Sequence, residues 1–144
     1  AESGEKKPVI MGSYGIGPGR LMGAIVEANS DEKGLVWGDE VSPFPAHLVC
    51  ISSGNKDVEE EADRYYEMLR EEGIEVLYDD RDLRAGEKFA DAELIGIPTR
   101  LVVSEKTVTA GGIEMTGRAN GKKNAANLVR ESEIVQELKG KKGK

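Results

Sequence analysis

The fold is decided by residues 46–80, which read AHLVCISSGNKDVEEEADRYYEMLREEGIEVLYDD. The first six residues are a continuous apolar run of strand length, which is typical of a buried strand in a parallel sheet. Residues 57–72 repeat apolar side chains at helical spacing, and Asp57 with Glu60 has the pattern of a capping box. Residues 74–78 are again apolar. The stretch therefore predicts a strand–helix–strand unit.

Downstream residues extend this unit. Residues 88–95 predict a short helix, and residues 100–103 predict a third strand, so that the order βαβαβ implies three parallel strands. Residues 113–118 and 122–129 flank Asn120-Gly121, a dipeptide that favours a two-residue hairpin turn. An antiparallel hairpin should complete the sheet. The predicted fold class is α/β, with a three-layer arrangement of a mixed five-stranded sheet and flanking helices, the last of them over residues 131–138.

The chain upstream of this fold has a different pattern. Residues 9–11 are a short apolar run followed by a glycine cluster, and residues 21–28 predict a helix. Residues 29–41 are polar and rich in turn formers, and two prolines follow Ser42 closely. We therefore place a domain boundary near Ser42, and we expect a short tail over residues 140–144.

Composition excludes several protein classes. With 38% hydrophobic and 33% charged residues, the 144-residue chain is typical of one globular domain with a short appendage. No run approaches the ~18 apolar residues that a membrane span needs. Residues 1–7 lack the apolar core of a signal peptide, and Cys50 has no second cysteine to pair with. These features predict a cytoplasmic protein with no membrane partner.

The net charge of −7 is unevenly spread. Residues 57–93 hold 15 acidic and 5 basic side chains, whereas residues 100–144 hold 10 basic and 5 acidic ones. Phosphate contacts act over short screened distances, so an acidic domain can still carry a local basic footprint for a polyanion. A solvated acidic helix and a solubilising lysine tail would give the same asymmetry.

Two segments could bind a ligand. Gly15, Gly17 and Gly19 precede a helix, where backbone N–H groups approach phosphates, and Arg20 would add a charged fork. Taken alone this is a weak signal, because glycine turns before helices are mostly structural.

The second segment follows a predicted strand. Phe89 and Glu93 share one helix face, and Arg100 opens the next strand. The three suit an unstacked guanine, which would stack on Phe89, donate to Glu93 and accept from Arg100. In the alternative interpretation, Phe89 is core, Glu93 is solvated and Arg100 pairs with an acid.

Other polar residues favour structural roles. Asp79, Asp80 and Asp82 resemble a metal or phospho-acceptor cluster, but residues 52–55 provide no second acidic group. His47 lies in an apolar strand without a nucleophile patterned around it, and Cys50 reads as a small buried side chain. We predict no metal site and no catalytic residue in this chain.

Six segments together have the pattern of one known family: MGSYGIGPGR at 11–20, DEKGLVW at 31–37, SPF at 42–44, GIEVLYDDR at 73–81, KFAD at 88–91 and LIGIP at 94–98. The sequence resembles the class II prolyl-tRNA synthetases of the bacterial type, and residues 11–20 look like motif 3 of the class II enzymes. The resemblance implies that residues 1–41 are the end of the catalytic domain, residues 42–140 an anticodon-binding domain, and residues 141–144 a basic tail.

The resemblance also implies roles. Gly15, Gly17, Gly19 and Arg20 would belong to the ATP site of a parent enzyme that uses ATP and magnesium, while the chain itself holds no cofactor. Phe89, Glu93 and Arg100 would read the guanines of the proline anticodon. The partners implied are proline tRNA, the catalytic domain and a second copy of the parent. Phosphates would be held by Arg118, Lys122 and Lys123.

Other interpretations stay open at the sequence level. Motifs 1 and 2 are missing, so the chain alone should not aminoacylate tRNA. It would be a fragment or a standalone paralogue. As part of a split or fragmentary synthetase it would still bind ATP through Arg20 with a partner chain. As a standalone or split-synthetase paralogue it could instead act as a general RNA-binding or protein-interaction module. A protein-interaction module using Tyr65 and Tyr66 is a third possibility. We also expect the apolar residues before Ser42 to be exposed or to pack against another chain.

Overall fold

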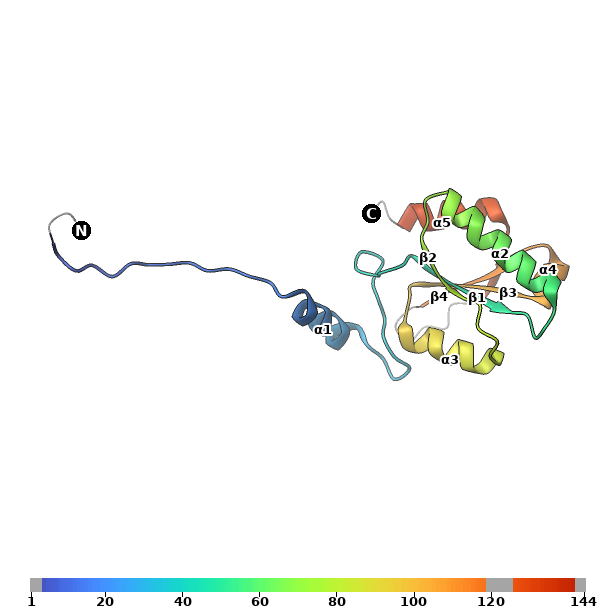
Figure 1. The fold of residues 1–144 in the computed structure, drawn as a ribbon, viewed down its shortest axis with the longest axis horizontal. Coiled ribbons are helices and arrows are strands. Elements are labelled where there is room, and N and C mark those ends of the chain that lie inside the picture. Colours follow the sequence, from blue (N-terminus) through green and yellow to red (C-terminus); the bar gives the residue numbers. More distant parts are fainter. Residues whose placement is uncertain (1–3, 119–125, 142–144) are drawn as a thin grey trace.

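The computed structural model describes residues 4–118 and 126–141. Figure 1 shows a folded body with an extended N-terminal segment that leads away from it. The elements in chain order are α1 (Pro18–Asn29), β1 (Ala46–Ile51), α2 (Lys56–Glu71), β2 (Val76–Asp79), α3 (Ala85–Ile95), β3 (Thr99–Ser104), α4 (Glu105–Ala110), β4 (Ile113–Gly117), β5 (Asn127–Val129) and α5 (Glu131–Lys141).

The five strands form one mixed sheet in the order β2-β1-β3-β4-β5. The strand β1 is parallel to both of its neighbours, β2 and β3, whereas β4 is antiparallel to β3 and β5 is antiparallel to β4. The predicted βαβαβ order, the mixed sheet and the closing hairpin are confirmed. The expected turn at Asn120-Gly121 lies outside the described residues.

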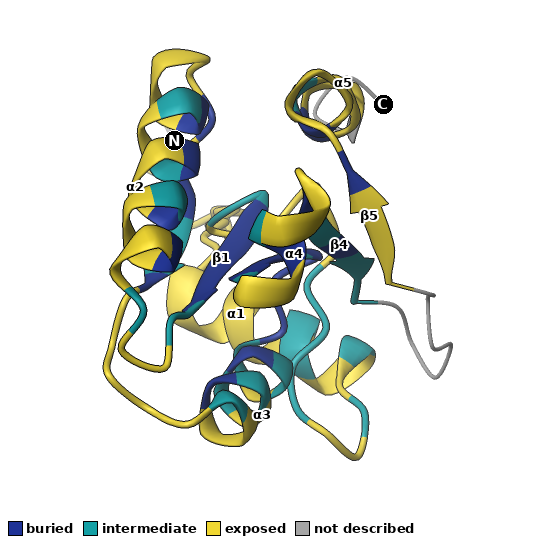
Figure 2. Ribbon diagram, turned by 90° about the vertical axis from the view of Figure 1, so that its right-hand side faces the viewer, coloured by how far each residue is buried: buried dark blue, intermediate teal, exposed yellow. Residues whose placement is uncertain are grey.

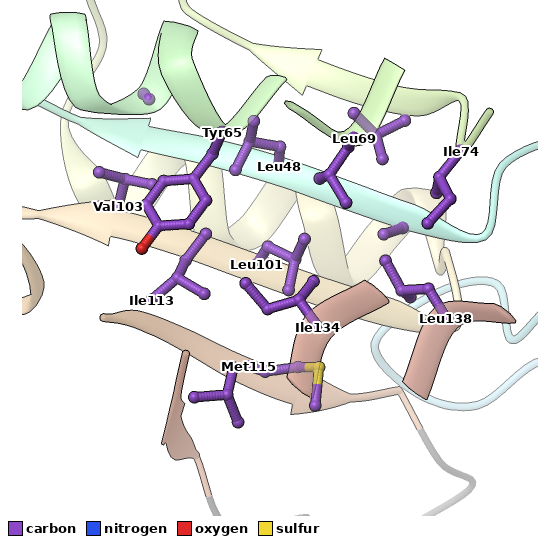
Figure 3. Close-up of a cluster of buried hydrophobic side chains, with 14 of the residues drawn as sticks. Leu48, Tyr65, Leu69, Ile74, Leu101, Val103, Ile113, Met115, Ile134 and Leu138 are labelled. Atoms are coloured by element: carbon purple, nitrogen blue, oxygen red, sulfur yellow. The ribbon is translucent and has the colours of Figure 1, made fainter. Parts of the chain in front are cut away.

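Helices cover both faces of this sheet, which confirms the three-layer arrangement. Figures 1 and 2 show α3 on one face and α2, α4 and α5 on the other. The main core lies on the second face, where apolar side chains from the sheet meet those of α2 and α5 (Figure 3). Each fully buried Leu or Ile of this core contributes on the order of 2 kcal/mol relative to exposure. These residues include Leu48, Leu69, Leu101, Ile113, Ile134 and Leu138.

The start of α2 corrects one local prediction. Asn55 is the N-cap, and its side chain accepts a hydrogen bond from the backbone N–H of Asp57. The expected capping box of Asp57 and Glu60 is therefore wrong, because the helix begins earlier than the acidic pair indicated. Tyr65 is 2% exposed and belongs to the core, which removes it from any interaction surface, and Tyr66 stacks on Tyr78.

Other elements differ from the predictions in length or existence. The helix α3 begins at Ala85 rather than Lys88, and α5 continues through residues 140 and 141. The short helix α4 was not predicted. Ser104 caps it by accepting a hydrogen bond from the backbone N–H of Thr107, and six residues are too few to show a helical period.

The N-terminal segment corrects a further prediction. Residues 9–11 form no strand, because a strand needs a partner for its backbone groups and none of the described residues pairs with them. Val9, Ile10 and Met11 are 84%, 97% and 86% exposed, and α1 has no buried residue. The exposed apolar segment expected before Ser42 is confirmed. None of the helices within the described ranges is long and apolar enough to cross a membrane.

Candidate nucleic-acid interface

The structure brings Phe89 and Arg100 into direct contact. The guanidinium carbon of Arg100 lies 4.9 Å from the ring centroid of Phe89, in a cation–π arrangement between β3 and α3. Glu93 lies one helical turn after Phe89. All three residues are half-buried. The structure thus brings the aromatic ring and the cation together where α3 covers the sheet, with the carboxylate of Glu93 on the next turn of the same helix. The role of the three residues in base recognition stays a prediction.

A buried lysine fixes α3 against the sheet. The Nζ of Lys88 donates hydrogen bonds to the backbone carbonyls of Cys50, at 2.6 Å, and Asp79, at 3.3 Å. Its side chain is 3% exposed. These two carbonyls lie near the carboxyl ends of β1 and β2, so Lys88 links both strands to the helix that carries Phe89. Sequence reasoning missed this residue, because a lysine is rarely buried without a paired charge.

The Asp79 carboxylate completes that link. It accepts hydrogen bonds from the Nε and Nη2 of Arg81 at 2.9 and 2.7 Å, and its Oδ1 lies 3.9 Å from the Lys88 Nζ. Arg81 also reaches Asp91 on α3. The hydrogen bonds from Arg81 hold the pKa of Asp79 below its usual value. Asp79 therefore belongs to an ion network, and the described residues contain no group of acidic, histidine or cysteine side chains able to hold a metal.

The segment that follows α1 docks on the end of α3. The backbone N–H groups of Leu35 and Trp37 donate to the carbonyls of Leu94 and Gly96, at 3.0 and 3.1 Å. The Trp37 indole Nε1 donates to the Ile95 carbonyl at 3.0 Å. These contacts come from within residues 29–41, for which the sequence predicted only polar, turn-forming character. The domain boundary near Ser42 stays a prediction, but the segment 31–37 is structurally part of the α3 surface.

Two glycines permit this docking. Gly96 has φ 75°, and a Cβ built on it would lie 1.8 Å from the carbonyl oxygen of Leu35. Gly34 has φ 146°, and its Cβ would lie 2.5 Å from the Cα of Leu94. Both positions require glycine, for backbone conformation and for close approach. The sequence signal that could have found the contact is this pair of glycines, one in each segment.

Arg118, which we predict to contact RNA phosphates, has a partner in the free structure. Its Nη1 and Nη2 donate to the two carboxylate oxygens of Asp31 at 2.6 and 2.7 Å, and the phosphate contact stays a prediction. The side chain is 11% exposed. This bidentate pair, together with a backbone N–H from Lys33, holds the pKa of Asp31 far below its usual range. The guanidinium group of Arg118 thus anchors the docked segment, residues 31–37, to the sheet.

Glu93 also has a partner in the docked segment. Its carboxylate lies 3.1 Å from the Nζ of Lys33, and both side chains are partly exposed. The backbone carbonyl of Glu93 accepts a long hydrogen bond, 3.4 Å, from the Nε of Arg118. The acid expected to read a base is thus ion-paired in the free structure.

The remaining predicted site residues fall elsewhere. Gly15, Gly17, Gly19 and Arg20 are exposed, and a Cβ built on any of the three glycines would meet no other described atom within 4 Å. Their role in the ATP site of a parent enzyme stays a prediction. Lys122 and Lys123 lie outside the described residues. His47 and Cys50 are buried, as the structural interpretation expected, and burial lowers the pKa of His47 and raises that of Cys50.

Residues 46–141, which run from β1 to the end of α5, match the model of the anticodon binding domain. This chain belongs to the anticodon binding domain family. The match covers the whole sheet and the four helices α2 to α5. It confirms the fold class that the resemblance implied.

Similarity to individual proteins extends beyond this domain. The chain is 47% identical to a proline–tRNA ligase of Parvibaculum lavamentivorans over 83% of its residues, and 40% identical to one of Endomicrobium trichonymphae over 94%. A proline–tRNA ligase of Persephonella marina is 42% identical over 88% of the chain. These matches cover 27%, 24% and 22% of the relatives. The chain thus spans about a quarter of their length, and the resemblance to prolyl-tRNA synthetases is confirmed.

Proposed function

We propose that this domain binds the anticodon loop of proline tRNA and reads its guanines with Phe89, Glu93 and Arg100. The observation that carries the proposal is the contact between Arg100 and Phe89 in a chain that is 47% identical to a proline–tRNA ligase. Phe89 provides a ring for stacking, Glu93 an acceptor for the N1 and N2 donors, and Arg100 donors for O6 and N7.

To bind, a guanine must displace two contacts that are present in the free structure. Arg100 already covers the Phe89 ring, and Lys33 already pairs with Glu93. A cation–π contact at a partly exposed site contributes about 0.5–1 kcal/mol, and an exposed ion pair about 0–1 kcal/mol. Stacking of one base contributes about 1–3 kcal/mol. An incoming guanine can therefore displace both contacts with net gain.

The whole protein would attach proline to its tRNA. In this proposal, residues 9–29 contact the remainder of a catalytic domain, where Arg20 would reach the phosphates of ATP with magnesium. That contact accounts for the exposure of Val9, Ile10 and Leu21. The parent enzyme would be a cytoplasmic homodimer. The chain by itself would release no pyrophosphate from ATP and proline, whereas a split synthetase would do so with its partner chain.

A binding titration tests the anticodon assignment. The wild-type chain is titrated with a stem-loop carrying the proline anticodon and with one in which both guanines are adenine. We expect tighter binding of the guanine loop, and Arg100→Ala should weaken that binding by about 1–3 kcal/mol while affecting the adenine loop less.

The control is Arg70→Ala, which removes the same charge from the exposed side of α2. It should change both affinities alike and only slightly. Equal affinities of the wild-type chain for the two loops, lost together at high salt, would show a nonspecific polyanion site and overturn the proposal.

A further inference from the structure

Three buried polar atoms in the described part of the chain have no hydrogen-bond partner. They are the Nδ1 of His47, the Nε of Arg100 and the Oγ1 of Thr116. An unpaired buried polar group costs about 1–3 kcal/mol, so most proteins leave few of them. Three such atoms therefore call for a physical explanation, which begins with where they lie on the sheet.

These atoms belong to neighbouring residues across the sheet. His47 on β1 is in register with Arg100 on β3, and Arg100 is in register with Thr116 on β4. Side chains in register lie on the same face, and the contact of Arg100 with Phe89 identifies it as the face covered by α3. We call His47, Arg100 and Thr116 the polar row.

The polar row has a closed end and an open end. His47 is 2% exposed, whereas Arg100 and Thr116 are half-buried. The pairing of β4 with β5 covers residues 113–115, so Thr116 lies beyond the last paired position in the described chain. Burial lowers the pKa of His47, so the positive charge of the row at neutral pH is that of Arg100. A ligand would approach at Arg100 and Thr116, and it reaches their buried polar atoms only once Arg100 has left the Phe89 ring, as the proposed function requires.

The chemistry of the open end matches one base edge. Arg100 and Thr116 present an N–H and an O–H donor from adjacent strands, and neither is used within the described protein. Guanine presents two neighbouring acceptors, N7 and O6, whereas adenine has an amino donor in place of O6. Arg100 can donate to N7 of either base, so the discrimination lies at Thr116. Its hydroxyl donates to O6 of guanine, whereas with adenine it would accept from the amino group and its own proton would have no acceptor among the described residues.

We propose that Thr116 is a specificity-determining residue that donates its hydroxyl, next to Arg100, to the acceptor edge of guanine. The inference rests on the proposed anticodon-binding function and adds a third strand, β4, to the base-reading surface. The free protein keeps these donors unpaired, and guanine satisfies them on binding. Removing the hydroxyl should thus affect recognition and folding in opposite directions.

The test compares Thr116→Val with the wild-type chain, using the guanine and adenine stem-loops. Valine keeps the shape and removes the hydroxyl, so the preference for guanine should fall about three- to tenfold. The thermal midpoint should stay the same or rise, because an unpaired buried group is lost. Thr116→Ser retains the hydroxyl and should keep the preference. Thr109→Val, on α4 across the sheet, is the control and should bind like wild type.

The outcomes separate the two proposals. A wild-type chain that does not prefer guanine overturns the proposed function, and this inference with it. A wild-type preference that survives in Thr116→Val overturns the inference alone. Equal losses in the Val and Ser variants would assign Thr116 to packing and also overturn it. Should Thr116→Val fail to fold, Thr116→Ala provides the same loss of hydroxyl, and its guanine preference decides.

Discussion

At the scale of single residues, the α3 face of the sheet differs from the main core by its polar side chains. Lys88, His47 and Asp79 are buried there, within the layer between α3 and the strands. Lys88 and Asp79 have hydrogen-bond partners, whereas the Nδ1 of His47 has none among the described residues. The consequence for stability depends on pH, because a buried neutral imidazole resists protonation.

His47 should make the fold less stable below about pH 6.5. Burial lowers its pKa in the folded state, while Asp79 and Asp91 raise it and Arg100 and Arg81 lower it further. Below the ordinary value of about 6.5, the unfolded chain binds the proton and the folded chain does not. The free energy of unfolding therefore falls as pH falls, by at most about 1.4 kcal/mol per pH unit, until the folded pKa is reached.

Urea unfolding at pH 7.5 and pH 5.5 measures this effect. His47→Gln removes the imidazole, and its free energy of unfolding should change less between the two pH values than that of the wild type. Asp31 and Asp79 do not interfere, because their hydrogen bonds to Arg118 and Arg81 lower the pKa values of both carboxyls, away from the interval between pH 5.5 and pH 7.5. Parallel pH dependence of the two proteins would show that His47 is not the cause.

At the scale of elements, the sequence predicted what the period of the apolar residues encodes. The strand β1 and the helix α2 were found because their apolar patterns extend over enough residues, whereas the capping box expected for α2 was wrong. The helix α4 was missed because it is short. The strand at residues 9–11 was wrong because pairing depends on a partner that an apolar run does not reveal.

The candidate site was predictable only in part. The spacing of Phe89 and Glu93 on one helix face could be read from the sequence, and so could the place of Arg100 on the next strand. The engagement of Arg118 by Asp31 could not, because these residues lie 87 positions apart and neither carries a local signal. The same holds for the polar row, which depends on the register of three strands.

The docked segment gives a prediction for Gly96→Ala. An added Cβ would meet the Leu35 carbonyl, and the φ of 75° is unfavourable for alanine. Gly111 has a similar φ, 68°, but open space around it. Gly111→Ala should thus cost about 1 kcal/mol of stability from backbone strain alone, and Gly96→Ala clearly more.

Trp37 provides the specific measurement. It is the single tryptophan of the chain, and its indole donates to the carbonyl of Ile95. Its fluorescence should shift to longer wavelength in Gly96→Ala, as the docked segment leaves α3, and stay unchanged in Gly111→Ala. Identical spectra and stabilities of the two variants would contradict the docking contact.

At the scale of the whole molecule, the chain consists of a folded domain and an N-terminal segment with few contacts. The segment exposes large apolar side chains, among them Ile10 at 97% and Tyr14 at 98%. Such a stretch in water favours association with another surface. Its stability contribution to the domain is expected to be small, since α1 buries no residue.

Removal of residues 1–29 tests this division. The shortened chain keeps the docked segment, so its free energy of unfolding should agree with that of the full chain within about 0.5 kcal/mol. It should also self-associate less, as measured by sedimentation at several concentrations. A large loss of stability would mean that the N-terminal segment contributes to the core.

The central claim is that RNA binds where α3 covers the start of β3. Amide chemical shifts of the ¹⁵N-labelled chain, followed during titration with the proline anticodon stem-loop, test this location most directly. We predict that the largest changes occur at Phe89, Glu93 and Arg100, with little change along α2. Changes concentrated on α2 or on residues 9–29, with none at these three residues, would contradict the account.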